Sequence, residues 1–277
     1  MAPSPNSIPS ATLASLFPGI EGNLPIEISS QLFSFGAPEM PLFLPYEQAV
    51  LAGIVRFTAP RHLLEFGTAQ GQTTFALAAN SPPDAEIHTV DIVQWTDYTR
   101  KCLRGDETIG AFYRSSPHAG KVRQIFRKVP DELPDELAAL RGRYDYIHVD
   151  GDHSYTGVRT DTQAALDLAA PDAILTWHDF YTFPDYVIEA PERRGVYPYL
   201  NELARSGSIT LRHIVGTYLV VGCRAWPRDM PGVLVQPGEP EAPFGRRNLR
   251  LADTGWKPQG AAPKDAADGG EDGAMRD

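Results

Sequence analysis

Apolar runs of strand length alternate with helical stretches through the middle of this chain, and that alternation restricts the fold more than any other feature. The first unit combines a strand-like run at residues 62–66, a Gly-rich turn at 67–74 and a helical stretch. Further strands are predicted at residues 86–90, 122–126, 144–149 and 173–177. Such a chain is expected to form a doubly wound α/β sheet with helices on both faces.

The final pair of predicted strands has a different geometry. Residues 209–214 and 217–221 both have strand character, and only Val215 and Gly216 separate them. Parallel neighbours need a crossover of roughly a dozen residues, so this pair must be antiparallel. We therefore expect a Rossmann-like sheet of about seven strands whose last strand is antiparallel.

Composition divides the chain into three parts. Residues 46–226 carry the alternating pattern and are expected to form the folded α/β domain, whereas residues 1–45 combine Pro, Ser and Gly with scattered apolar side chains. That mixture is typical of a segment draped over a domain, so we interpret it as an N-terminal lid. Residues 227–277 are Pro- and Gly-rich and are predicted to be a largely disordered tail, unless Val233–Val235 pack back on the domain.

Charge and cysteine content narrow the classes of partner. The net charge is −10 and no run is rich in Lys or Arg, which argues against nucleic acid or an anionic membrane as partner. There is no basic leader and no apolar stretch of about 18 residues. Cys102 and Cys223 are expected to be reduced thiols. We therefore expect a cytoplasmic protein with a small-molecule partner, and the sequence leaves a homo-oligomer open.

Polar clusters directly follow two of the predicted strands. Residues 144–149 lead into Asp150–Tyr155, and residues 173–177 lead into His178 and Asp179. The carboxyl ends of parallel strands share one edge of the sheet, where open α/β folds bind ligands. We interpret both clusters as parts of one site, although Gly, Asp and Ser are also ordinary residues of solvated turns.

The turn after the first strand has features of a nucleotide site. Gly67 and Gly71 lie in it, and Asp91 ends the second strand at the spacing of an acidic residue that binds ribose hydroxyls. A dinucleotide fold would have glycine at Ala69, because that glycine lets the backbone approach a pyrophosphate. A ligand without a phosphate therefore fits better than NAD or FAD.

These stretches resemble the motifs of a known family. Glu65–Gly71, with Asp91, is similar to the first motif of class I S-adenosylmethionine (SAM) dependent methyltransferases. The later motifs resemble a branch that includes O-methyltransferases of bacterial secondary metabolism and cephalosporin hydroxylase-like proteins; they are Val149–Tyr155, Asp161, Thr162 and Trp177–Asp179. The resemblance covers about residues 46–223 and implies the class I fold with SAM as cofactor.

The resemblance also implies which residues bind SAM. Asp91 would bind the ribose hydroxyls, and the other expected cofactor ligands are Glu65, Gly67, Thr68 and Gly71. One departure concerns adenine: relatives often carry Gly-Asp where this chain has Arg127 and Lys128. The adenine contact would then come from elsewhere, for example from Asp131, or be weaker.

A metal site is implied by the same resemblance. In metal-dependent members, residues at the positions of Asp150, His178 and Asp179 hold a divalent cation. Magnesium is the expected ion, because Mg²⁺ is commonly held by one or two carboxylates together with waters and substrate oxygens. His178 is a poor Mg²⁺ ligand but suits softer metals, so its alternative roles are to orient a carboxylate or to bind substrate.

Methyl transfer from a sulfonium is a direct displacement that needs an acceptor oxygen in line with the methyl group and a group that removes its proton. Asp150 is expected at the centre of this chemistry, with His153 as the candidate base, because an imidazole titrates near neutral pH. The alternative for His153 is a helix-start residue. Asp152 is interpreted as a helix-start charge, Asp161 as part of a solvated helix face and His148 as a satisfied core histidine.

Other functions stay open at this stage. The first alternative is a protein of the same fold that uses the metal site without methyl transfer, as a hydroxylase-like or accessory subunit; Arg127 and Lys128 favour it. A non-catalytic SAM-binding module is another, and an NAD oxidoreductase is disfavoured by Ala69. The acceptor is not identified, but five aromatic residues favour a ring-bearing small molecule; they are Phe33, Phe35, Phe43, Trp95 and Tyr98.

Overall fold

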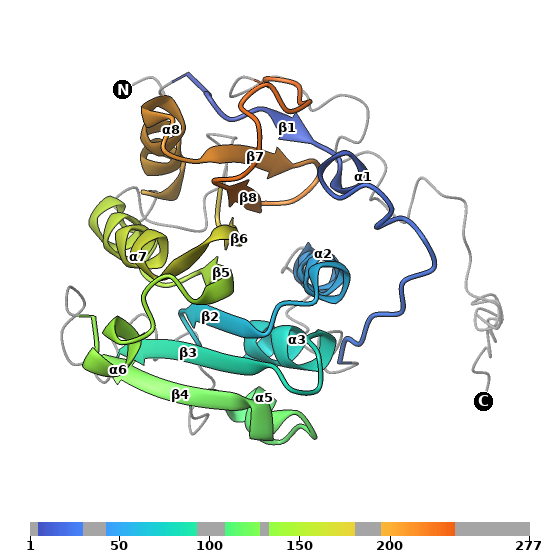
Figure 1. Ribbon diagram of the computed structural model, residues 1–277, viewed down its shortest axis with the longest axis vertical. Helices are drawn as coiled ribbons and strands as arrows, with labels where there is room; N and C mark the ends of the chain where they lie inside the picture. The colour runs from blue at the N-terminus through green and yellow to red at the C-terminus, as the bar shows by residue number, and fades with distance from the viewer. Residues whose placement is uncertain (1–4, 30–42, 93–108, 128–132, 181–194, 236–277) are drawn as a thin grey trace, which may run out of the picture.

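The computed structural model describes residues 5–29, 43–92, 109–127, 133–180 and 195–235. Within them, an eight-stranded sheet has the order β1-β7-β8-β6-β5-β2-β3-β4 (Figure 1). The strands are β1 (Ser10–Ala11), β2 (His62–Phe66), β3 (Glu86–Ile92), β4 (Val122–Arg127), β5 (Tyr144–Val149), β6 (Ala169–Trp177), β7 (Thr210–Ile214) and β8 (Val220–Cys223). The helices are α1 (Leu13–Leu16), α2 (Phe43–Thr58), α3 (Gln72–Asn80), α5 (Ala111–Arg114), the 3-10 helix η2 (Ala119–Lys121), α6 (Asp135–Ala138), α7 (Tyr155–Leu168) and α8 (Val196–Ser206).

The strand directions confirm the expected fold class. The neighbours from β4 across to β6 are all parallel, whereas β8 lies antiparallel between β6 and β7. The carboxyl ends of β2, β3, β4, β5 and β6 therefore meet at one edge of the sheet. This is the arrangement in which the two polar clusters predicted from the sequence come together.

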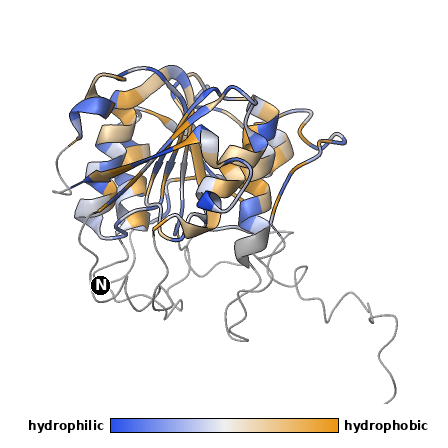
Figure 2. Ribbon diagram, turned by 90° about the horizontal axis from the view of Figure 1, so that it is seen from below, coloured by the Kyte–Doolittle hydropathy of each residue, from blue (hydrophilic) through white to orange (hydrophobic). Residues whose placement is uncertain are grey.

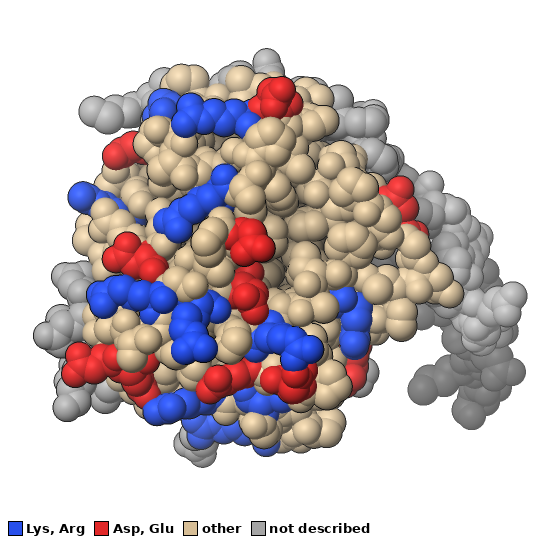
Figure 3. Space-filling model, in the orientation of Figure 1, with Lys and Arg blue, Asp and Glu red and all other residues tan. Residues whose placement is uncertain are grey.

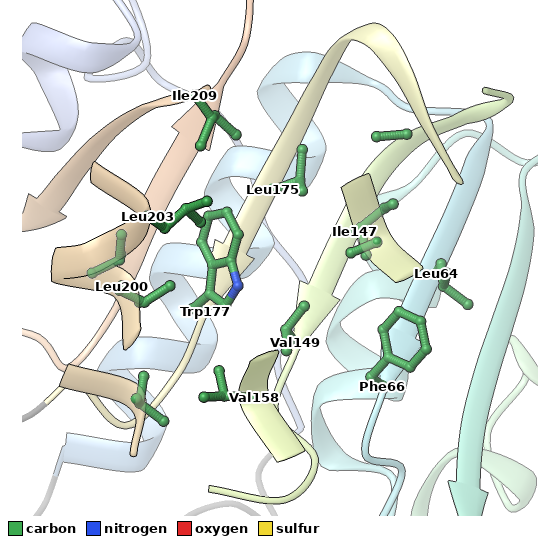
Figure 4. Close-up of a cluster of buried hydrophobic side chains, with 14 of the residues drawn as sticks. Leu64, Phe66, Ile147, Val149, Val158, Leu175, Trp177, Leu200, Leu203 and Ile209 are labelled. Carbon is green, nitrogen blue, oxygen red and sulfur yellow. The ribbon is translucent and has the colours of Figure 1, made fainter. Parts of the chain in front are cut away.

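Alternation along each strand divides the core between the two faces of the sheet. Leu64 and Phe66 of β2 pack in one cluster with residues of α6, α7 and α8, whereas Leu63 packs with residues of α1, α2 and α3 on the opposite face. Figure 2 shows the apolar sides of the helices turned toward the sheet. Figure 4 shows Trp177 at the centre of the first cluster, with Val158 of α7 and Leu200 of α8 around it.

One predicted boundary is wrong. Pro171 was expected to lie between a helix and a strand beginning at residue 173, but β6 begins at Ala169 and includes Pro171. A strand tolerates proline where a ladder hydrogen bond is already missing. The register of β5 against β6 shifts between Tyr144 and Tyr146, so the ladder is irregular beside Pro171.

The described N-terminal residues are built into the sheet. β1 extends it by pairing in parallel with β7, and the side chain of Ile8 is fully buried in the core. Ser10 also exchanges two backbone hydrogen bonds of 2.7 Å with Val233, which joins the two ends of the described chain. The side chain of Val233 nevertheless remains exposed. Residues 30–42 of the predicted lid and 236–277 of the predicted tail lie outside the described residues.

On the face shown in Figure 3, Lys and Arg side chains are interspersed with Asp and Glu. None of the described helices is long and apolar enough to cross a membrane. Cys223 is a buried free thiol, and Cys102 lies outside the described residues.

Candidate active site

The Gly-rich turn after β2 makes direct backbone contact with the start of the first polar cluster, Asp150–Tyr155. Gly67 has a φ of +94°, and a Cβ added there would overlap the backbone carbonyl of Asp150. The Asp150 amide donates to the Phe66 carbonyl at 2.8 Å. Only glycine allows both the left-handed backbone and this close approach. The predicted cofactor turn and the predicted catalytic turn are therefore neighbours in space.

Asp91 holds the same turn from the end of β3. Its Oδ2 accepts hydrogen bonds from the amides of Thr68 and Ala69, at 3.1 and 2.9 Å. Asp91 is half-buried, and burial raises the pKa of its carboxyl group. A carboxylate has about four lone-pair sites, so these contacts leave acceptor capacity for ribose hydroxyls. Asp91 thus lies where the sequence predicted a ribose ligand.

Glu65 is a fully buried carboxyl group beneath the turn. Its Oε2 accepts from the hydroxyls of Thr74 and Thr89, each at 2.5 Å, while its Oε1 has no hydrogen-bond partner among the described residues. Burial raises the pKa of Glu65 to about 8 despite these two hydrogen bonds. Thr68, a predicted cofactor ligand, directs its hydroxyl to Thr89 at 2.6 Å and is buried. It supports Glu65 through this relay.

Residues 109–114 have no clear sequence pattern, and they pack against the outside of the Gly-rich turn. The Gly110 amide donates to the Ala69 carbonyl at 2.8 Å, and a Cβ added at Gly71 would lie 2.7 Å from the Tyr113 ring. Gly71 begins α3 with a φ of +87°. The glycine is therefore required both by its backbone conformation and by the close packing of α5.

Asp150, His153 and Asp179 converge at the ends of β5 and β6. Each offers a ligand atom, and these atoms all lie within 4.8 Å of one another. His153 Nδ1 is 2.8 Å from Asp179 Oδ2, and His153 Nε2 is 3.5 Å from Asp150 Oδ1. Asp179 has a φ of +59°, a left-handed conformation that aspartate tolerates better than most residues.

His178 joins the same group from the other side. Its Nδ1 lies 3.4 Å from Asp150 Oδ1 and 3.2 Å from Asp179 Oδ1. Its Nε2 lies 3.0 Å from Oε2 of Glu47, a buried residue of α2 that sequence reasoning did not find. The other Glu47 oxygen accepts from the Tyr218 amide at 2.6 Å. The signal in the sequence that could have indicated Glu47 was a Glu within an amphipathic helical stretch.

Comparisons with known proteins agree with this geometry. A family model described as a methyltransferase domain matches residues 64–180, which include β2 through the end of β6. This part of the chain is therefore similar to methyltransferase domains. No curated protein sequence matches the chain significantly.

Two solved structures share the fold of this chain. One, from Staphylococcus aureus and described as a caffeoyl-CoA O-methyltransferase, is 15% identical with a TM-score of 0.52, covering 70% of this chain and 91% of its own. The other is a methyltransferase from Podospora anserina with S-adenosylhomocysteine (SAH) bound. It is 16% identical with a TM-score of 0.50 and covers 74% of this chain and 91% of its own.

The charges of this site stabilise one another. Burial would raise the pKa of Asp150, but the imidazoles of His178, His148 and His153 hold that pKa well below its usual range. Asp179 is lowered in the same way by His178 and His153. Burial opposes the charged form of His178, yet the nearby carboxylates of Asp179, Asp150 and Glu47 raise its pKa well above the ordinary value. The site is thus built for ionised carboxylates facing a positive charge.

His148 is only partly the satisfied core histidine that the sequence predicted. Its Nδ1 lies 2.9 Å from the hydroxyl of Thr176, and the side chain is completely buried. Its Nε2 has no hydrogen-bond partner among the described residues and lies 3.8 Å from Asp150 Oδ2. His148 therefore lies beside Asp150 Oδ2 on the buried side of that carboxylate.

Asp152 lies at the start of α7, as predicted. Its Oδ1 accepts from the Ser154 amide at 3.0 Å and its Oδ2 from the Ser154 hydroxyl at 2.8 Å. Ser154 is the N-cap and accepts from the Gly157 amide. These contacts fix the turn that carries His153.

The predicted solvated position of Asp161 is wrong. Asp161 is buried on α7, and its Oδ1 lies 2.8 Å from the guanidinium of Arg127, which is also buried and lies over the Phe66 ring. The helical pattern could not show this partner, because Arg127 is at the end of β4. Lys128, Asp131 and the aromatic residues proposed for substrate lie outside the described residues or side chains.

Proposed function

We propose that this enzyme transfers the methyl group of SAM to a hydroxyl oxygen of a small molecule, with the help of a divalent cation. The observation that carries the proposal is the contact between the two turns. Gly67, in the cofactor turn, packs on the carbonyl of Asp150, whose carboxylate belongs to the group with His153 and Asp179. A methyl donor on the first turn would therefore face the carboxylates and imidazoles.

The donor set fits a divalent cation. Asp150 and Asp179 supply two carboxylates from adjacent strand ends, and their ligand atoms lie close enough to share one ion. When bound, such a cation lowers the pKa of an acceptor hydroxyl and orients it. Asp150 and Asp179 would hold the ion, and the imidazoles of His153 and His178 lie beside these carboxylates.

His153 is the proposed base. Its Nδ1 is 2.8 Å from Asp179, so a proton on Nδ1 would be donated to that carboxylate and the lone pair would be on Nε2. The side chain is about one quarter exposed, which leaves it accessible to a substrate. His153 would take the hydroxyl proton at Nε2 as the acceptor oxygen attacks the methyl carbon and the sulfonium sulfur leaves with its bonding electrons.

Oxygen is proposed as the acceptor atom because the Staphylococcus aureus structure of the same fold is described as an O-methyltransferase. The cation supports this choice, since a bound divalent ion lowers the pKa of a hydroxyl group and orients its oxygen. The substrate class proposed is a small, ring-bearing hydroxyl compound of the secondary-metabolite kind.

The proposal is tested with SAM that carries an isotope label on its methyl group and a panel of phenols, catechols and sugar alcohols. Mass spectrometry should find a labelled O-methyl product and SAH, with formation lost in EDTA and restored by a divalent ion. Asp150→Asn should lower turnover by at least about 100-fold, as loss of a metal ligand does. Label found on nitrogen or carbon, or turnover unaffected by EDTA, would refute the proposal.

A further inference from the structure

The cation site proposed above contains more nitrogen than magnesium accepts. Mg²⁺ prefers octahedral oxygen ligands, whereas imidazole nitrogen suits ions such as Zn²⁺, Fe²⁺, Co²⁺ and Ni²⁺. We infer that His178 is a direct ligand of the cation, and that the site takes a transition-metal ion in preference to Mg²⁺. This inference rests on the proposed function, because it concerns the ion of that same site.

The orientation of His178 is the first support. Glu47 Oε2 lies 3.0 Å from Nε2, so Nε2 would donate to Glu47 when Nδ1 binds a metal ion. Nδ1 lies 3.4 and 3.2 Å from the oxygens of Asp150 and Asp179, on the side where the cation would be held. A carboxylate behind an imidazole that faces other ligands is the usual support of a metal-bound histidine.

Glu47 is itself held rigidly. It is 2% exposed, and its second oxygen accepts from the Tyr218 amide at 2.6 Å. The contact joins α2 to the loop before β8, so His178 is oriented by elements outside the strand that carries it. An imidazole that only filled space would need no such buried carboxylate.

His148 is a second, independent support. It is fully buried, its Nε2 is without a hydrogen-bond partner in the described part of the chain, and that nitrogen lies 3.8 Å from Asp150 Oδ2. Asp150 Oδ1 faces His178 and His153 instead. One Asp150 oxygen is thus turned toward a supporting histidine and the other toward the proposed ion.

His153 also faces the carboxylates, and the two imidazoles must be distinguished. The side chain of His153 is 25% exposed against 16% for His178, and it lies on the turn before α7. Its Nδ1 is already 2.8 Å from Asp179, which suits a base whose Nε2 accepts a proton. His178 is therefore the ligand and His153 the base.

The test uses Co²⁺ as a spectroscopic probe on the full-length protein after removal of metal. Nitrogen ligation should give visible d–d bands, and calorimetry should show Co²⁺ or Zn²⁺ binding at least about tenfold more tightly than Mg²⁺. His178→Asn should change the Co²⁺ bands and weaken Co²⁺ about 10- to 100-fold, and Glu47→Gln should weaken it in the same direction. His178→Asp should shift the preference toward Mg²⁺.

His62→Asn is the matched control, because His62 lies at the start of β2, at the opposite edge of the sheet, and pairs with Asp145. It should leave the Co²⁺ bands and affinity unchanged, and thermal melts should show that all variants remain folded. Mg²⁺ binding as tightly as Co²⁺, or His178→Asn with unchanged bands and affinity, would overturn the inference. If the inference failed in this way but labelled O-methyl product formed with Mg²⁺, the proposed function would stand. Absence of SAM binding would refute the proposed function and not the inference about the ion.

Discussion

Ala69 holds a side chain in a backbone conformation that usually requires glycine. Its φ is +45°, in the turn that carries Gly67 and Gly71. For an L-residue with a Cβ this left-handed conformation costs roughly 1–2 kcal/mol. Glycine avoids that cost, but part of the gain is offset because glycine has more conformational freedom to lose from the unfolded chain. The same residue had argued against a dinucleotide at the sequence level, and the structure shows that it also strains the turn.

Ala69→Gly should therefore raise the free energy of unfolding by about 1 kcal/mol, measured by urea denaturation. Ala59→Gly is the matched control, because Ala59 has a φ of +48° just after the last residue of α2 and lies away from the site. Both variants should gain stability, but only Ala69→Gly should change SAM affinity. Loss of stability at either position would contradict the backbone argument.

Glu65 predicts a particular dependence of stability on pH. Its pKa is about 8 in the folded protein against an ordinary 4.5, so the folded state binds the proton more tightly. The contribution of Glu65 to the free energy of unfolding should then be fully present below pH 4.5 and be lost as pH rises through 8. At about 1.4 kcal/mol per pKa unit, the loss is of the order of 5 kcal/mol.

Glu65→Gln removes the titrating group while keeping its shape. Urea denaturation of both proteins at pH 5 and pH 8 should show a smaller fall for the variant, because the wild type alone loses stability through this carboxyl group. Equal falls in the two proteins would mean that Glu65 is not held in its neutral form.

At the level of single residues, the sequence predicted what lies at strand ends and missed what lies elsewhere. Asp150 and Asp179 could be placed together because parallel strands end at one edge. Glu47 could not, because it reaches His178 from a helix far away in the sequence. The buried position of Asp161 could not be predicted either, because its partner Arg127 lies on another element, β4.

Between elements, the buried ion pair of Arg127 and Asp161 joins β4 to α7. A Cβ added at Gly151 would lie 2.5 Å from Asp161 Oδ2. The Asp161 carboxylate therefore also packs on the backbone of the turn that carries Asp150 and His153. Arg127 thus links the end of β4, through Asp161, to the turn that carries Asp150 and His153. A structural role for Arg127 follows from this geometry.

Arg127→Met should lower the free energy of unfolding by about 3–5 kcal/mol, because it leaves Asp161 buried without its charged partner. Adding Asp161→Asn should recover much of that loss, since the uncompensated charge is removed. A double-mutant cycle from urea denaturation gives the coupling. Strictly additive effects of the two changes would contradict a direct interaction.

The elements themselves were largely predictable. Alternation and the short link at Val215–Gly216 indicated the parallel core and the antiparallel end, because periodicity and loop length are local properties. The beginning of β6 was not, since the irregular pairing that admits Pro171 depends on β5. Residues 109–114 have no periodic pattern, and only their contacts with the Gly-rich turn define their place.

For the whole molecule, the N-terminal residues contribute to the core of the sheet. Ile8 is completely buried, whereas Ile26 is 38% exposed. Ile8→Ala should cost about 2–5 kcal/mol of unfolding free energy, the range for a buried large-to-small change. Ile26→Ala, the matched control, should cost less than about 0.5 kcal/mol. Similar small effects at both positions would show that this segment only drapes over the domain.

The central claim is that one edge of the sheet holds two adjoining sites, one for SAM and one for the cation. Calorimetric titration of SAM into the wild type, Asp91→Asn and Asp150→Asn tests it most directly. We predict one SAM per chain in the wild type, an affinity at least about tenfold weaker in Asp91→Asn, and little change in Asp150→Asn. Absence of SAM binding in the wild type, or equal loss in both variants, would contradict the account.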